Sequence, residues 1–414
     1  MQYLCGLSEF TDKPVFDASL FVTIRKRISM EEINDMVTSI INRELMMKED
    51  KKQCNNQGES NDDTSSSANQ DDNGAEFTDS QGHKHKGILK MDATCADAEV
   101  RFPVDVDIIH DGCKVVDRYI SSLCIKHVRS SYKMARSFYL ELVKRKKKGG
   151  KFVKETIAHL LHYLSVDLRK ITDIFVDYTG SKEMLQPHER RILNAVFDMF
   201  HQHTYMYENN IHTCANRIIS IFQPHLRPIK KGKARAKTEF GAKIGTVIYD
   251  GYTFIDHHSW DAYNESQDLE LHIQKFKERF GHLSATVHAD KIYLNRANRK
   301  YLEDEEIKSY CKPLGKPSKE SKTLEFIAKM TKPVGERNEI ECSFGTGKRI
   351  YRANNIRSKL PETSECWTGM CYFVKNVMKF LRGLCLVLSE IWFIFTVGNL
   401  EERKVRCAPI VAKY

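Results

Sequence analysis

The sequence lacks three features that would assign it to other classes of protein: a long apolar run, a CxxC pair and an excess of acidic residues. The apolar stretch from Leu384 to Val397 is interrupted by Ser389 and Glu390, and it falls short of the roughly 20 residues that a membrane span needs. The 12 cysteines are scattered, unlike those of a short secreted disulfide scaffold. We therefore expect no membrane partner, a buried C-terminal helix, and free thiols in a reducing cytoplasm.

The N-terminal sequence MQYLCGLSEF has no basic region followed by an apolar run, so no signal peptide is expected. Lys and Arg number 65 against 55 Asp and Glu, which gives a formal charge of +10 and favours an anionic partner, nucleic acid first. At about 150 residues per domain, 414 residues predict two or three domains. A hydrophobic content of 41% excludes a chain that is disordered throughout.

Composition divides the chain into four segments. Residues 1–47 form a small helical segment, in which Ser29 and Glu32 have the spacing of a capping box. Residues 48–86 are rich in Ser, Asn, Asp and Gln, and we interpret them as a disordered linker because they offer almost nothing to bury. Residues 87–382 form the main domain, and residues 383–414 an apolar helix and tail.

Apolar periodicity predicts the elements of the main domain. They are a strand over 88–93, a helical block over 105–222, a hairpin over 239–256 with Asp250-Gly251 as its turn, a helix from Leu269 to Phe280, a short strand over 284–290, a helix from about Leu294, and a helical region over 336–360. This order predicts an α/β fold with a ribonuclease-H-like mixed sheet, flanking helices and a large all-helical insertion after the first strand.

Three acids occupy positions from which carboxylates can converge: Asp92 in the first strand, Asp290 at the end of a short strand, and Glu341 near the start of the last helical region. Two-metal phosphoryl transfer uses such carboxylates to hold two magnesium ions, or manganese, about 3.5–4 Å apart. In a continuous helix, Arg337, Glu341 and Lys348 would share one face. The alternative is coincidence, since this spacing is common on helix surfaces.

Other acids compete for the role of metal ligand, and Asp250 among them is better explained as a turn residue. These are Asp97, Asp105, Asp107, Asp250 and Asp256.

Basic residues flank the second and third acids, and we interpret them as phosphate contacts for DNA, with a solvated surface as the alternative. The candidates are Arg227, Lys230, Lys231, Lys233, Arg235 and Lys237 before the hairpin, Arg296, Arg299 and Lys300 after Asp290, and Lys312, Lys316, Lys319 and Lys322 in a loop. Trp260 could stack on a base, although a packing role is favoured.

Several stretches together resemble one family. They are DATCADAEVRFPVDVDII (92–109), QPHLRPIKKGKARAKTEFGAKI (223–244), SWDAYNES (259–266), ADKIYLNRANRKYL (289–302), ERNEIECSFGTGKRIYRANNIRSKLPET (336–363) and, near the N-terminus, KPVFDASLFVTIRKR (13–27). They resemble the motifs of bacterial insertion-sequence DDE transposases, in the IS-four/IS-five superfamily branch with a DUF772-type N-terminal segment.

The resemblance implies a ribonuclease-H fold, metal-dependent DNA strand cleavage and strand transfer. It implies that Asp92, Asp290 and Glu341 are the catalytic triad, while Lys348 and Arg337 hold phosphate or orient Glu341. The implied partner is double-stranded DNA, bound by a homodimer in the bacterial cytoplasm at the nucleoid. Two alternatives stay open: an N-terminally truncated, non-catalytic DNA-binding remnant, and a ribonuclease-H-like nuclease without strand transfer.

Overall fold

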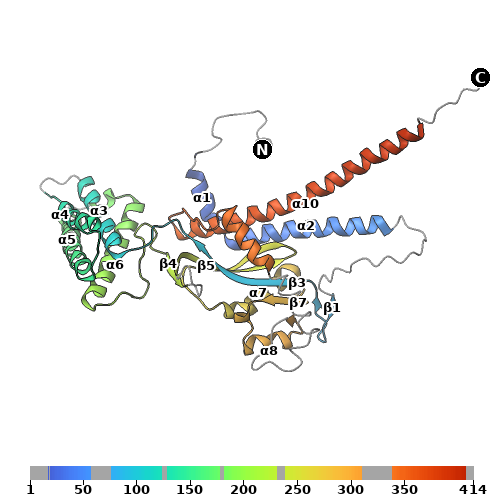
Figure 1. Ribbon diagram of the computed structural model, residues 1–414, viewed down its shortest axis with the longest axis horizontal. Helices are drawn as coiled ribbons and strands as arrows, with labels where there is room; N and C mark the ends of the chain where they lie inside the picture. The colour runs from blue at the N-terminus through green and yellow to red at the C-terminus, as the bar shows by residue number, and fades with distance from the viewer. Residues whose placement is uncertain are drawn as a thin grey trace, which may run out of the picture.

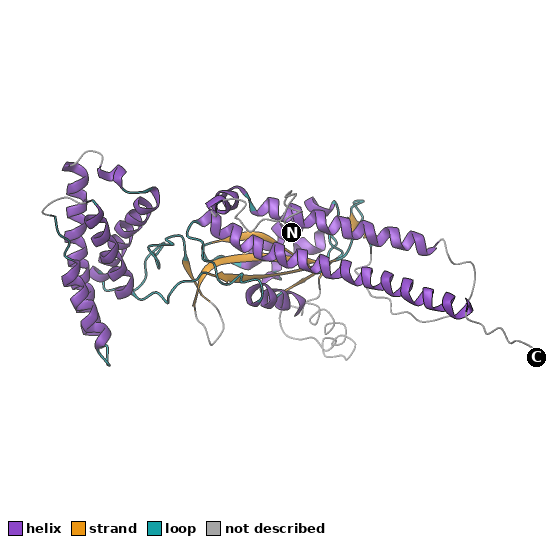
Figure 2. Cartoon of the chain, turned by 90° about the horizontal axis from the view of Figure 1, so that it is seen from above, coloured by secondary structure: helices purple, strands orange, loops and turns teal. Residues whose placement is uncertain are grey.

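The computed structural model describes residues 17, 19–56, 76–123, 128–177, 181–230, 238–309 and 338–406. These residues form two bodies: a mixed sheet with helices packed around it, and a separate group of helices (Figure 1). Seen from above, the helical group lies at one end of the molecule, and two long helices extend from the sheet toward the other end (Figure 2). None of the helices among the described residues is long and apolar enough to cross a bilayer.

The sheet is built around β3 (Ile88–Asp97), which pairs antiparallel with β5 (Thr238–Tyr249) on one side and parallel with β7 (Thr286–Ala289) on the other. β8 (Lys308–Ser309) extends it beyond β7 in parallel. On its far side, β5 pairs antiparallel with β4 (Arg227–Lys230) and then with β6 (Tyr252–Ser259). The sheet therefore mixes an antiparallel half with a parallel half, and β3 is the strand where they meet.

The predicted hairpin is confirmed. β5 and β6 are joined at Asp250 and Gly251, whose φ angles of 47° and 73° suit a two-residue turn with both central residues left-handed. A register shift at Gly245 and Thr246 lets Asp256 stand out of the ladder.

Helices cover both faces of the sheet. On one face, α7 (Asp268–Phe280) packs Leu269 and Ile273 against Leu89 and Met91 of β3, with α8 (Arg296–Asp304) beyond it. On the other face, a helix over residues 338–349 packs against β5, and α10 (Pro361–Arg406) crosses it. Alternate residues of β3 therefore face different helices, which decides where its acidic side chains lie.

The free edge of β6 is closed by two asparagines from helices at opposite ends of the chain. Asn34 of α2 (Met30–Asn56) donates to the Ile255 carbonyl at 2.8 Å and accepts from its N–H at 3.4 Å. Asn376 of α10 does the same for Thr253, at 2.7 and 3.0 Å. Each carboxamide thus replaces a strand partner, so that no buried backbone group of these two residues is left unpaired.

The helical unit, which we define as residues 105–222, lies between β3 and β4 in sequence. It contains α3 (Asp105–Ser122), α4 (Tyr132–Lys144), α5 (Gly150–Asp177) and α6 (Pro187–Glu208). These helices share an apolar core that includes Val116, Leu160, Leu164 and Val196. α3 and α5 approach closely at Gly112, where an added Cβ would lie 3.6 Å from Leu164.

Several predicted boundaries differ from the structure. α2 continues from Met30 to Asn56, past the predicted end of the helical segment at residue 47. β1 (Phe77–Thr78) and β2 (Lys84–His85) form a small hairpin inside the segment interpreted as a linker, while residues 57–75 lie outside the described part. α10 passes without a break through the predicted boundary at residue 383. α1 (Ser19–Arg27) completes the N-terminal helices.

Candidate active site

Asp92 lies in the central strand and belongs to the face of the sheet opposite to α7. Its neighbours Leu89 and Met91 are fully buried under α7, and the alternation of the strand turns Lys90 and Asp92 to the other side. Asp92 pairs with Thr246 of β5, and its own Oδ1 accepts a hydrogen bond from the Ala93 N–H at 2.8 Å. The side chain is half-buried, so the carboxylate is held by the strand and is still reached by solvent.

Asp290 follows the last residue of β7, and the sheet brings it level with Asp92. Paired residues of β3 and β7 differ in number by 198 (286 − 88), up to the pair Met91 and Ala289. Asp92 and Asp290 have the same difference (290 − 92) and come one position later. Neighbouring strands lie about 4.8 Å apart, and paired residues share a face. Continued by one residue, the register would put the two acids at adjacent positions on one face of the sheet.

The Asp290 side chain also ends the strand. Its Oδ1 accepts from the Lys291 N–H at 2.7 Å, and the chain turns away into a short 3-10 helix, η4 (Lys291–Tyr293). The carboxyl end of a strand that stops in this way is a common place for a functional side chain in α/β proteins.

The helix over 338–349 carries Glu341 across the same face. Ile340 and Phe344 pack with Ile244 and Ile248 of β5, and Ser343 Oγ lies 2.9 Å from Thr253 Oγ1 of β6. At about 100° per residue, Glu341 is on the opposite side of the helix from Ser343. Glu341 therefore lies on the side of the helix that faces away from β6, and it is exposed.

Lys348 shares this side of the helix, since seven residues make nearly two turns. Glu341 is exposed and Lys348 is half-buried. Glu339, two residues before Glu341, forms an ion pair with Lys90 of β3 and so fixes the start of the helix beside the strand that holds Asp92. Gly345 and Gly347 do not interrupt the helix.

Many of the predicted DNA contacts lie outside the described residues, as does one predicted catalytic residue. These are Arg337, Lys231, Lys233, Arg235, Lys237, Lys312, Lys316, Lys319 and Lys322, and for Lys230 only the strand position is described.

Four predicted DNA contacts can be placed, of which Lys300 is exposed on α8. Arg227 donates from Nη1 to the carbonyls of Pro224 and Leu226, at 2.7 and 3.0 Å, so its guanidinium supports the local backbone. Arg299 donates from Nε to the Leu294 carbonyl at 2.9 Å. Arg296 is exposed on α8, in the segment that follows Asp290.

The competing acids are largely accounted for by structural partners. Asp256 is buried against His272 and Arg279; although burial alone would raise its pKa, the hydrogen bond from His272 and the charge of Arg279 lower it overall. Asp105 pairs with Arg217 and lies 3.4 Å from His203. Asp107 lies 3.4 Å from Arg101. These carboxylates act as anchors of the fold.

A network that sequence reasoning missed lies on the α7 side of the sheet. Asp268 contacts His257 Nδ1 at 2.9 Å, and both lie close to Gly245, where an added Cβ would be 2.9 Å from the Asp268 carboxylate and 3.0 Å from Tyr263 Oη. No local pattern marked Asp268, because its partners come from β5 and β6. Trp260, in turn, packs at right angles to His225 and His258, which confirms its packing role.

Cys95, Asp97 and Glu239 form a second group with potential ligands for a metal. One ligand atom from each lies within 4.8 Å of the others, and among the described residues no other trio of His, Cys, Asp or Glu meets this criterion. Odd-numbered residues of β3 face away from Asp92, so this trio lies on the other face of the sheet. A thiol ligand also suits zinc better than magnesium, which prefers oxygen.

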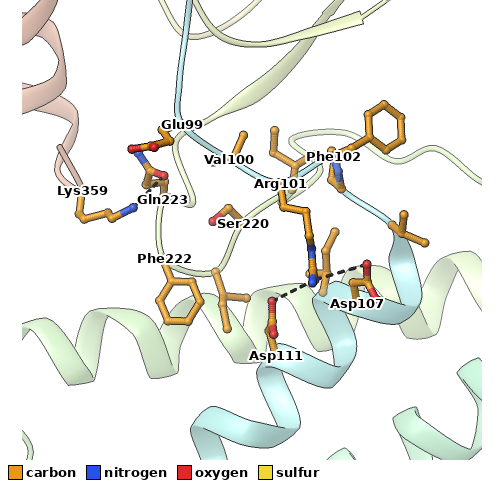
Figure 3. A pocket seen from close by; sticks show the side chains of 15 residues that line it. Glu99, Val100, Arg101, Phe102, Asp107, Asp111, Ser220, Phe222, Gln223 and Lys359 are labelled. Atoms are coloured by element: carbon orange, nitrogen blue, oxygen red, sulfur yellow. Dashed lines mark hydrogen bonds and ion pairs between the residues drawn. The ribbon is translucent and has the colours of Figure 1, made fainter. Parts of the chain in front are cut away.

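A pocket of about 280 Å³ lies where the chain passes between the sheet and the helical unit (Figure 3). It is lined by residues 99–104, by residues 219–223, by part of α3 and by Lys359. Arg101 reaches across to α3, where it lies 3.4 Å from Asp107 and 3.6 Å from Asp111. None of the three predicted acids borders this pocket, so we interpret it as part of the junction between the two bodies.

Comparison with known families gives a match to the part of the chain that contains Asp290, Glu341 and Lys348. Residues 287–378 match the family described as Transposase DDE domain. The matched stretch runs from β7 into α10 and includes Asp290, Glu341 and Lys348, while Asp92 precedes it. The match supports a transposase function, and with it a divalent metal and DNA as substrate. No curated protein and no solved structure matches the chain.

Proposed function

We propose that the chain is a DDE transposase that cleaves DNA strands and transfers them during movement of an insertion sequence. The observation that carries the proposal is the parallel register of β3 and β7, whose last pair, Met91 and Ala289, directly precedes Asp92 and Asp290. Of these two acids, only Asp290 lies within the stretch that matches the family.

The fold supports the same assignment. A central strand with an antiparallel hairpin on one side and two parallel strands on the other is compatible with a ribonuclease-H-like sheet. On this assignment the helical unit is an insertion after the first strand of the sheet. The proposal also includes three finer statements: the chain belongs to the IS-four/IS-five grouping, its N-terminal segment is of the DUF772 type, and it acts on DNA as a homodimer.

The predicted ligands fit the metal that this chemistry needs. Asp92, Asp290 and Glu341 offer only carboxylate oxygens, the hard ligands that magnesium and manganese prefer. Two such ions would activate the attacking oxygen and stabilise the leaving one. The residues of the chain hold the reactants: the two aspartates are fixed by the sheet, and Lys348 and Arg337 contact phosphate from the side of Glu341.

The test is nicking of supercoiled plasmid DNA in the presence of magnesium. We expect Asp92→Asn and Asp290→Asn each to reduce nicking by about 10³-fold or more, the scale of losing a main source of charge stabilisation, with little change in DNA affinity. Asp304→Asn, an exposed acid of α8 within the matched stretch, serves as the matched control and should nick normally.

Joining of a pre-cut DNA end to a second duplex separates transposition from simple nuclease activity. If the unaltered chain binds DNA but neither nicks nor joins it, the non-catalytic remnant is the better description. Nicking that survives in both aspartate variants would remove the site assignment.

A further inference from the structure

The positive charge of the helical unit is concentrated in a single turn. Residues 105–222 contain 19 basic and 13 acidic residues. Seven of the basic residues and none of the acidic ones lie in KRKKKGGKFVK (144–154), which we call the basic turn. The rest of the unit has 12 basic and 13 acidic residues, which nearly cancel. The basic turn therefore supplies the whole excess of positive charge in this unit.

Two of the seven cations hold the turn in shape. Arg145 pairs with Glu141 of α4 at 2.8 Å, and its guanidinium lies 3.4 Å from the ring centre of Phe152 in α5. Lys154 donates to Asn210 Oδ1 at 3.0 Å. The Arg145 contacts tie the end of α4 to the start of α5, and Lys154 links α5 to the segment after α6, so the turn is held on both sides.

The other five cations are exposed and have no ion-pair partner among the residues that the structure describes. They are Lys144, Lys146, Lys147, Lys148 and Lys151. Other basic residues of the unit, such as Lys170 and Arg217, are paired with acids. Unpaired cations occur elsewhere in the described part of the unit, but only here do five of them lie within eight consecutive residues with no acid among them.

The turn also stands at the positive end of a long helix. α5 has 28 residues and no acid in its first turn, and the N-terminus of a helix carries a partial positive charge that cations make worse. Gly149 and Gly150 have no atoms within 4 Å of the position of a Cβ, so the backbone there is open. In the unbound protein these charges repel one another, and an anion would relieve the repulsion.

We propose that the basic turn binds the phosphate backbone of duplex DNA, at a place separate from the predicted acids. The inference rests on the proposed function for its choice of duplex DNA among polyanions. It adds a second contact surface, on the helical unit, to a protein whose predicted chemistry lies on the sheet. The contact carries no sequence preference, because lysines on phosphates position a duplex without reading it.

The test compares two triple variants of the full chain with equal loss of charge. One replaces Lys146, Lys147 and Lys148 by Gln; the control replaces Lys114, Lys133 and Arg169, exposed residues elsewhere in the unit, by Gln. Affinity for a duplex of arbitrary sequence is measured without divalent metal at several salt concentrations. The slope of log affinity against log salt should fall by about 2 to 3 for the first variant and change little for the control.

Equal slopes for the two variants would overturn the inference. The inference would also be overturned if a variant with Arg at these three positions bound the duplex as weakly as the Gln variant. A loss of affinity for single-stranded RNA, without a loss for the duplex, would overturn it as well. Thermal unfolding provides a second readout: the Gln variant should unfold at the same or a higher temperature, because repulsion is removed. The binding assay needs no cleavage. A chain that does not nick DNA can therefore still show the expected change in salt dependence, and a chain that nicks DNA can fail to show it.

Discussion

The helical unit and the sheet bury very different kinds of side chain. The helical unit buries mostly apolar side chains, with Thr156, Asp167 and His203 as its buried polar residues among those described, and its helices are neighbours in sequence. The sheet body buries Asp256, His272, Asn34 and Asn376, each paired with a residue from another element. The proposed chemistry therefore falls on the body in which long-range pairing fixes polar groups, and the proposed DNA contact at the basic turn falls on the other body.

The first way to test this comparison is to weaken each core separately. Leu164 of α5 and Leu89 of β3 are both fully buried, in different clusters. Leu→Ala at such sites costs about 2–5 kcal/mol. We expect Leu164→Ala to reduce hydrogen-exchange protection over 105–222 and leave β3, β5 and β7 protected, and Leu89→Ala to do the opposite. Loss of protection in both bodies from either change would show that they unfold as one.

The asparagines on the β6 edge give the next largest effect. Asn376→Ala would leave the N–H and carbonyl of Thr253 without partners, which we expect to cost about 2–4 kcal/mol, since each unsatisfied buried group costs about 1–3 kcal/mol. Asn194→Ala, at an exposed position of α6, is the matched control and should change stability by less than about 0.5 kcal/mol. Denaturant unfolding followed in the sheet body measures both. If Asn376→Ala lowered the free energy of unfolding as little as Asn194→Ala does, water would be able to replace the Asn376 side chain.

These edge contacts also show what the sequence could not predict. Local signals were sufficient for the β5–β6 hairpin, for α7 and for the helical character of residues 105–222, and the structure confirms each of them. They were insufficient for the length of β3, whose small residues Thr94 to Asp97 pair with β5 as far as Gly241. Periodicity carries no information about pairing between residues more than 120 positions apart, such as Asn376 with Thr253.

The candidate site divides in the same way. Asp92, Asp290 and Glu341 were proposed from their places in strands and a helix, and the parallel register supplies the step that aligns the first two. The Asp268 network was missed because its partners meet only through the bulge of the β5–β6 ladder. The Cys95 trio was missed because its members belong to two strands.

Acid should weaken the sheet body more steeply than the helical unit, because the pKa is lowered to about 4 for His225, His258 and His288, against His110 in the helical unit. Burial, aided by the neighbouring His257 and His225 imidazoles, lowers the pKa of His258 to about 4, against about 6.5 in an unfolded chain. As the pH falls from 6.5 toward 4, the unfolded state takes up a proton that the folded state does not, so stability is full above pH 6.5 and is lost below it. The slope for one such group is at most about 1.4 kcal/mol per pH unit.

His258→Gln removes this titration and should flatten the pH dependence of unfolding of the sheet body by up to that amount, whatever it does to stability at neutral pH. His188→Gln, at an exposed position of α6, is the control and should leave the slope unchanged. An unchanged slope in His258→Gln would assign the acid sensitivity to other groups.

The smallest effect concerns the helix that carries Glu341 and Lys348, where two glycines provide a matched pair. A Cβ at Gly345 would meet nothing within 4 Å, whereas a Cβ at Gly347 would lie 2.9 Å from Cε1 of the buried Tyr372 ring. Ala in place of Gly inside a helix gains about 1 kcal/mol when nothing is displaced. Gly345→Ala should therefore raise the unfolding temperature of the sheet body by a few degrees and keep DNA nicking. Gly347→Ala should lower the unfolding temperature, because Tyr372 or the helix must move. If both substitutions were stabilising, the close packing of this helix on α10 would not limit its position.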